Sequence, residues 1–153
     1  MDIRVIGLGL AGRREEARAA LIEMRRASSI PLFLAWIELL MAWLDRRPAD
    51  MVLDPAKIGP LRVFDDPEAM FQQGWLFCDA GAHERGLEYL QRAVAHGYFV
   101  APTLSGSRHF DALRTSLAFQ ALLEEAETGR RAALTAFREA GGHRLLGLPT
   151  GAA

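Results

Sequence analysis

The stretch that most constrains the fold runs from residue 66 to 97 and reads DPEAMFQQGWLFCDAGAHERGLEYLQRAVAHG. Asp66 and Pro67 form a helix start, because a short carboxylate accepts free backbone N–H groups and proline fits the first helical position. Apolar residues then recur at helical spacing until Gly81, which stops this helix and turns the chain. A second amphipathic helix follows and ends at Gly97. Neither helix can bury its apolar face alone, so the sequence predicts a helical hairpin that needs neighbours.

The spacing of this hairpin recurs earlier in the chain. Moving back 34 residues from Gly81 reaches Arg47, and a further 35 residues reaches Gly12. Apolar and aromatic residues accompany both positions at the expected offsets: Trp36, Leu39, Leu40 and Trp43 before Arg47, and Ala17, Leu21 and Met24 after Gly12. Three registers therefore agree over residues 1–98.

This pattern resembles the tetratricopeptide repeat (TPR), whose 34 residues carry W-x2-L-G-x2-Y followed by A-x3-F. The corresponding positions here are Met70-x2-Gln73-Gly74-x2-Phe77, then Gly86-x3-Leu90 and Ala93. Met70, Gln73 and Gly86 depart from the motif, and Tyr98 stands where the closing proline is usual. The resemblance implies an all-α fold, a right-handed α-solenoid of about three TPR-like helical hairpins with a long C-terminal capping helix.

On this reading one domain spans residues 1–148, with repeats at about 1–29, 30–64 and 66–98. The first helix is short and turns at Gly12. The helix at 30–44 should have only a short or broken partner within residues 48–64, because prolines and a glycine interrupt that segment. We also expect a disordered tail at residues 149–153.

After residue 98 the regular helical spacing of apolar residues is interrupted. Residues 101–106 are expected to be a loop, 109–113 a short helical turn, and 116–140 a long helix that could bend at Gly129 and bury Leu117. Together they form a capping segment over residues 101–142. The phrase HFDALR at residues 109–114 resembles the closing segment of TPR-like regions in larger bacterial regulatory proteins. That resemblance implies that this chain is part of such a regulator.

Composition narrows the class of protein. The chain has 153 residues, half of them hydrophobic, and a net charge of −1, which suits a globular domain and gives no sign of nucleic-acid binding. Its single cysteine, Cys78, fits a reducing cytoplasm. The most apolar stretch, residues 30–44, contains Glu38 and is shorter than the ~20 residues of a membrane span. We therefore expect a cytoplasmic protein that makes no membrane contact.

An alternative comes from the N-terminus, where Gly7-x-Gly9-x-x-Gly12 has the spacing of a dinucleotide-binding fingerprint. In such a site a strand precedes the glycines, and an acid about 20 residues later holds the ribose. Here the segment after Ser28 opens a long apolar helix whose first acid is Glu38. A nucleotide-binding enzyme is therefore the second hypothesis.

No catalytic set is visible among the reactive residues. The four histidines, His83, His96, His109 and His143, have no metal-site spacing such as HExxH. Cys78 with Asp79 and His83 would suggest a nucleophile and a base, but an inert small residue is more typical on an apolar helix. The sequence predicts a protein that is not an enzyme and holds no metal or cofactor.

The resemblance also implies a concave groove lined by the first helix of each repeat. The positions that carry over are Leu34, Ile37, Met41 and Leu44 in the second repeat, and Glu68, Phe71, Trp75 and Cys78 in the third, with Asp79 beside them. Aromatic residues and methionine in a groove favour a non-catalytic scaffold that binds a protein or peptide partner, or a second copy of the chain as a homodimer. The alternative, held equally open, is that neighbouring helices cover these residues.

Overall fold

The computed structural model of the chain describes residues 3–52 and 66–147, and every regular element in these ranges is helical. The all-α prediction is therefore confirmed. In chain order the elements are α1 (Ile3–Leu10), α2 (Arg14–Ala27), α3 (Pro31–Leu44), the 3-10 turn η1 (Pro48–Asp50), α5 (Pro67–Asp79), α6 (His83–Ala95), α7 (Ala101–Gly106), the 3-10 turn η3 (Arg108–Leu113), α8 (Leu117–Glu139) and α9 (Gly142–Leu145).

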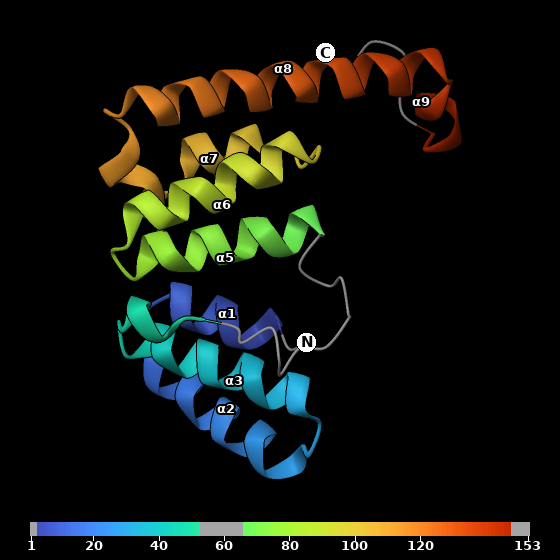
Figure 1. Cartoon of the computed structure of the whole chain (residues 1–153). Coiled ribbons are helices and arrows are strands. Elements are labelled where there is room, and N and C mark those ends of the chain that lie inside the picture. The colour runs from blue at the N-terminus through green and yellow to red at the C-terminus, as the bar shows by residue number, and fades with distance from the viewer. Residues whose placement is uncertain (1–2, 53–65, 148–153) are drawn as a thin grey trace.

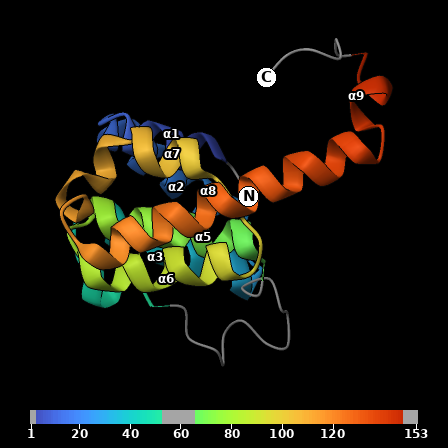
Figure 2. The same ribbon diagram turned by 90° about the horizontal axis from the view of Figure 1, so that it is seen from above.

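The helices lie one above another, from α2 and α3 at one end, through α1, α5 and α6, to α8 at the other (Figure 1). α1 therefore lies beside α5, although α2, α3 and η1 separate them in the sequence. Seen from above, the C-terminal half of α8 extends well beyond the other helices (Figure 2). This arrangement exposes that half of α8 to solvent.

The predicted hairpin at residues 66–97 is confirmed as α5 and α6. Asp66 caps α5 with its Oδ1 atom, which accepts hydrogen bonds from the N–H groups of Glu68 at 2.8 Å and Ala69 at 3.0 Å. Gly81, at φ 88°, makes the left-handed turn between the two helices. The two helices pack closely at Gly86, where an added Cβ would lie 2.4 Å from Cys78 Sγ. The departure from the repeat motif at Gly86 therefore has a packing reason.

Two hydrophobic clusters fill the interior, and α5 belongs to both. The first cluster joins α1, α2 and α3 around Val5, Leu21 and Trp43, which are all 0% exposed. Leu76 and Phe77 of α5 pack into it. The second cluster lies between α5 and α8 and contains Met70, Phe71, Cys78, Leu90, Ala93, Val94, Ala101, Leu104, Phe110, Leu113, Phe119, Leu122 and Ala126.

The C-terminal segment differs from expectation in two ways, at residues 101–106 and at Leu117. Residues 101–106 form helix α7 and not a loop, with Pro102 in the first turn where proline is tolerated. α8 continues as a helix through Gly129, and the ring of Phe99 packs against this glycine, 2.3 Å from where a Cβ would lie. Leu117 was expected to pack but is 83% exposed.

Past α8 the chain turns at Gly141, as predicted, and then forms the short helix α9, which the sequence analysis missed. Phe137 packs closely on Gly142 at this turn. Of the predicted segment 48–64, η1 lies within the described residues, whereas 53–64 and the expected tail at 149–153 lie outside them.

Candidate partner-binding surface

Four of the nine expected groove residues are buried, and four more are partly buried. Ile37 and Leu44 are 2% and 4% exposed and belong to the first cluster, while Phe71 and Cys78 are 4% and 3% exposed and belong to the second. Leu34, Met41, Trp75 and Asp79 are partly buried. Because the α3 and α5 positions pack into different clusters, they do not form the continuous open strip that was expected.

A smaller opening remains between α1 and α5, which we call the Gly7 pocket. It has a volume of about 250 Å³. Its lining consists of Ile6, Gly7 and Leu10 from α1, Glu68, Phe71, Gln72, Trp75 and Leu76 from α5, and Tyr98 after α6. Glu68, Phe71 and Trp75 are three of the expected groove positions, and all three line this pocket.

Trp75 forms one wall of this pocket within a group of rings. Its indole centroid lies 5.6 Å from that of Phe71, in an edge-on arrangement, and 5.8 Å from that of Phe110. The imidazole of His109 lies 5.9 Å from it on another side. Such aromatic pairs stabilise each other beyond the area they bury, so the wall is held in place.

Two buried polar atoms of the pocket-lining residues have no hydrogen-bond partner among the residues that the structure describes: Trp75 Nε1 and Gln72 Oε1. Gln72 is held only loosely, through a 3.4 Å hydrogen bond from its Nε2 to Glu68 Oε1. A buried polar atom without a partner usually costs about 1–3 kcal/mol. The Gln72 amide is therefore held less firmly than the apolar side chains of the two clusters.

The carboxylate of Asp79, at the end of α5, joins four elements behind this wall. Its Oδ2 atom accepts hydrogen bonds from Arg14 Nη2 in α2, at 2.7 Å, and from Trp43 Nε1 in α3, at 2.9 Å. His109 Nδ1 in η3 lies 3.1 Å from Oδ1, and we assign the ring hydrogen to this nitrogen because a carboxylate oxygen can only accept. We interpret this as a structural centre, because the carboxylate is occupied by three donors.

Arg14 was not singled out in the sequence, and neither was its pairing with Asp79. The guanidinium also donates, through Nη1, to the carbonyl oxygen of Leu44 at 3.0 Å, which closes the end of α3. No short-range pattern links residues that are this far apart in the chain. The remaining pocket residues were not predicted as site residues for the same reason, whereas Gly7 was visible only as part of the glycine motif; they are Ile6, Leu10, Gln72, Leu76 and Tyr98.

Within the described residues, the cysteine, aspartate and histidines considered in the sequence analysis do not come together as a catalytic or metal site. Burial of the thiol and, to a smaller extent, the charge of Asp79 together raise the pKa of Cys78 from 9.0 to about 12. A neutral thiol packed on Gly86 is a poor nucleophile. In residues 3–52 and 66–147, no group of three or more His, Cys, Asp or Glu side chains could hold a metal ion.

The three N-terminal glycines lie in two different elements, the helix α1 and the turn after it. Gly7 and Gly9 lie within α1, so the described residues before them, 3–6, are helical and not a strand, and Gly12 takes φ 83° in the turn to α2. A Cβ on Gly9 would lie 2.2 Å from the ring of Trp43. The strand, glycine turn and helix of a dinucleotide site are therefore not formed by these residues.

A second opening, of about 390 Å³, lies where α3 meets η1. Met41 and Ile37 reach it, but charged side chains dominate its edge: Arg25, Glu38, Asp45, Arg47 and Asp50. Arg18 and Arg47 both pair with Asp45 there, and the Arg18 hydrogen bond lowers the pKa of this carboxyl group. These charges already neutralise one another, so the Gly7 pocket is the stronger candidate for a partner.

Comparison with protein-family models, with curated proteins and with solved structures gives no match. The resemblance to the tetratricopeptide repeat therefore stays a prediction from the sequence. Among the helices that the structure describes, none is both long and apolar enough to cross a membrane.

Proposed function

We propose that this chain is a non-catalytic protein-interaction module. On this proposal its hairpins stack as a TPR-like right-handed solenoid, α8 covers one end, and the Gly7 pocket receives part of a partner protein. The observation that carries the proposal is an apolar opening with a firm aromatic wall, lined by Gly7 and Trp75, on a helical protein. Concave, mostly apolar openings with aromatic anchors are the usual form of a binding site.

Several features support the same proposal. The hairpin of α5 and α6 has the glycine turn and close helix contact of a repeat unit. The thiol of Cys78 is buried and neutral at ordinary pH, so it favours packing over catalysis. The 34-residue recurrence and the resemblance at residues 109–114 suggest a place in a larger bacterial regulatory protein.

Site-specific photo-crosslinking tests this function. A benzophenone amino acid at Gln72, on the pocket wall, should form a defined covalent adduct with a partner in an extract of the source cells. The same group at Gln91, an exposed position of α6, is the control. The partner would be identified by mass spectrometry, purified and titrated against the wild-type chain.

We expect that titration to give saturable binding that Gly7→Leu abolishes. Adducts that are equally strong at Gln72 and Gln91, or a purified partner that binds Gly7→Leu as well as the wild type, would contradict the proposed function.

A further inference from the structure

The fold does not explain why residue 7 is a glycine. Gly7 lies inside α1, where glycine is less favourable than alanine. A Cβ at this position would meet no heavy atom within 4 Å, whereas a Cβ at Gly9 would strike the ring of Trp43. Packing within the chain therefore requires a glycine at position 9 but not at position 7. What Gly7 provides is the open space beside it, which is the pocket itself.

The volume of the Gly7 pocket indicates the size of the group that it can hold. At about 250 Å³ the Gly7 pocket is smaller than the ~300–1,000 Å³ typical of sites for cofactors and other small molecules. It exceeds the ~150 Å³ cavity that accommodates a benzene ring. A single large apolar side chain, aromatic or aliphatic, therefore suits it, and a dinucleotide does not.

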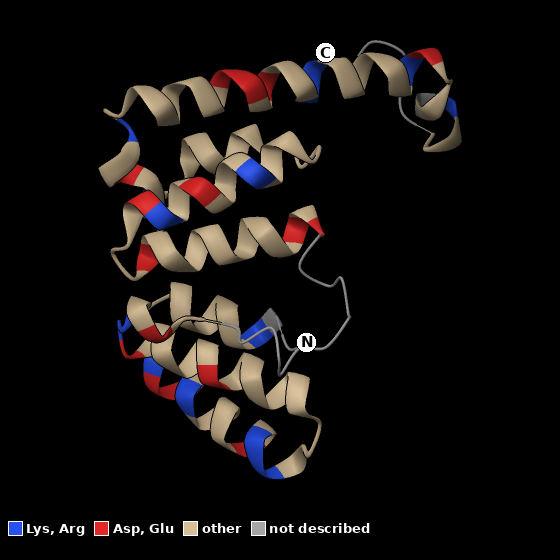
Figure 3. Cartoon of the chain, viewed as in Figure 1, with Lys and Arg blue, Asp and Glu red and all other residues tan. Residues whose placement is uncertain are grey.

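The charge around the pocket indicates which kind of residue would lie next to that side chain in the partner. Glu68 is the charged residue of the lining, and with Asp66 it makes the start of α5 acidic (Figure 3). Burial raises the pKa of the Tyr98 hydroxyl, and the carboxylates of Glu68 and Asp66 raise it further. The pKa of Glu16 in α2 is lowered chiefly by its hydrogen bond from Arg13, and the charge of Arg4, on α1, adds a smaller effect. An acidic edge favours a cationic neighbour over an anionic one.

From this combination we infer that the Gly7 pocket binds a large apolar side chain of a partner polypeptide, and that a basic residue next to it in the partner pairs with Glu68 and Asp66. The inference rests on the proposed function and names the chemistry of the partner segment. Gln72 gives the occupant a further contact, because its weakly held amide can turn toward a backbone N–H of the bound segment.

Four acetylated and amidated pentapeptides serve as probes: GRFRG, GQFQG, GEFEG and GRARG. Each is titrated into ¹⁵N-labelled protein, and the amide of Gly7 and the indole N–H of Trp75 are followed by NMR. The indole signal is assigned with Trp75→Phe. We expect GRFRG to bind about threefold to tenfold more tightly than GQFQG and more tightly still than GEFEG, because exposed ion pairs contribute modestly. GRARG, which lacks the apolar side chain, should leave both signals unmoved.

Three variants make the test specific. Gly7→Leu fills the pocket and should abolish binding of GRFRG, whereas Gly106→Leu, at a helical glycine of α7 that also has open space, should not. Glu68→Gln should reduce the preference for GRFRG over GQFQG by about twofold to fivefold. Raising the salt concentration to about 1 M should reduce the same preference, because exposed charges are then screened.

The inference is overturned if no phenylalanine peptide moves Gly7 or Trp75, if the acidic peptide binds as well as the basic one, or if Gly7→Leu still binds. It is also overturned if the wild-type chain dimerises and Gly7→Leu does not, since the occupant is then a second copy. Should Gly7→Leu fail to fold, the peptide series and Glu68→Gln still decide the matter. A partner captured at Gln72 while all four peptides fail would reject this inference and leave the proposed function standing.

Discussion

Asp79 Oδ2 lies 2.7 Å from Arg14 Nη2, although 65 residues separate the two in the sequence. The side chains are only 10% and 21% exposed, so the ion pair is largely shielded from water. Because Trp43 donates to the same oxygen, the contact ties the helices of the first cluster to the end of α5. This pair is the main polar contact by which α5 is fixed against the N-terminal helices.

Removing the Asp79 carboxylate should destabilise the fold strongly. Asp79→Ala leaves Arg14, Trp43 and His109 without their acceptor, and we expect it to lower the free energy of unfolding by about 2–4 kcal/mol. Denaturant melts followed by circular dichroism would measure this loss. The matched control is Asp50→Ala, whose pair with Arg47 is 54% exposed on both sides and should contribute less than about 1 kcal/mol. The double variant Arg14→Ala/Asp79→Ala should lose clearly less than the sum of the single losses.

Alanine at the two glycines of α1 should have opposite effects. Gly9→Ala drives a Cβ into Trp43, which is 0% exposed and held by its hydrogen bond to Asp79, so the ring cannot move aside. We expect a loss of about 1–3 kcal/mol. Gly7→Ala meets open space and should gain up to about 1 kcal/mol from helix propensity. Thermal melts of both variants decide the point, and a destabilised Gly7→Ala would mean that the pocket is closed.

The thiol of Cys78 should react slowly while the chain is folded. Since the native pKa is raised to about 12, the reactive thiolate is scarce at pH 8, and we expect modification by Ellman's reagent to be about a hundredfold slower than in guanidinium chloride. The raised pKa also means that the neutral thiol favours the fold below the unfolded pKa of 9.0, and that this contribution is lost as the pH rises from about 9 to 12. In Cys78→Ala the decline in stability over that range should be shallower. Equal rates in folded and unfolded protein would show that the thiol is accessible.

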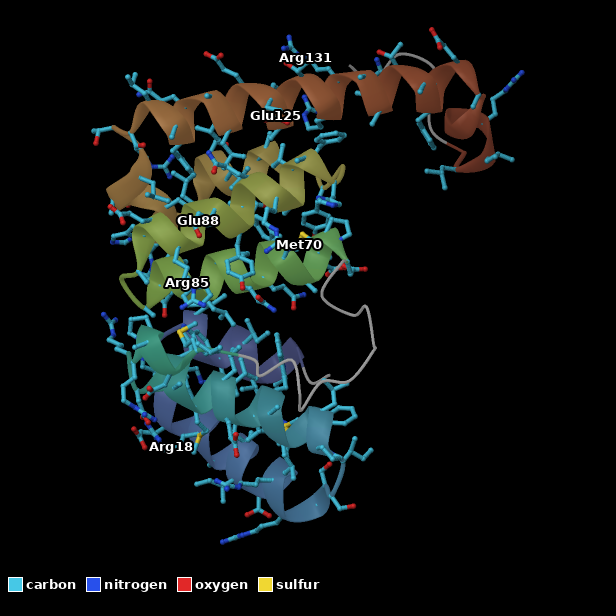
Figure 4. All side chains as sticks on the ribbon, in the orientation of Figure 1. Arg18, Met70, Arg85, Glu88, Glu125 and Arg131 are labelled. Carbon is cyan, nitrogen blue, oxygen red and sulfur yellow. The ribbon has the colours of Figure 1, made fainter. Side chains whose placement is uncertain are left out.

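The outer half of α8 should be dispensable for stability. All side chains from residue 131 to 140 are exposed, and Arg131 projects from the outer surface of the helix (Figure 4). A chain that ends at Arg130 should therefore unfold within about 1 kcal/mol of the full chain. A chain that ends at Ser116 also loses Phe119, Leu122 and Ala126, which are at most 2% exposed, and should melt far lower. A large loss from the shorter deletion would show that this half of α8 has a partner in solution.

The sequence by itself determined the local structure. Cap residues and turn glycines act within a few positions of the helix ends they define, and so Asp66, Gly81 and Gly97 predicted α5 and α6 correctly. The apolar period likewise predicted α2, α3 and α8 to within about two residues. The loop predicted at residues 101–106 is wrong, because Pro102 lies in the first turn of α7, where proline is compatible with a helix.

Only the tertiary structure decided which apolar faces are covered. The positions of Ile37 and Phe71 look equivalent in the sequence, yet the first is packed among α1–α3 and the second lies in the α5–α8 cluster at the edge of a pocket. Periodicity shows that a face is apolar but not what lies against it, because that depends on how distant helices stack. The pairing of Arg14 with Asp79 and the open space at Gly7 arise in the same way, from contacts between segments that no local pattern connects.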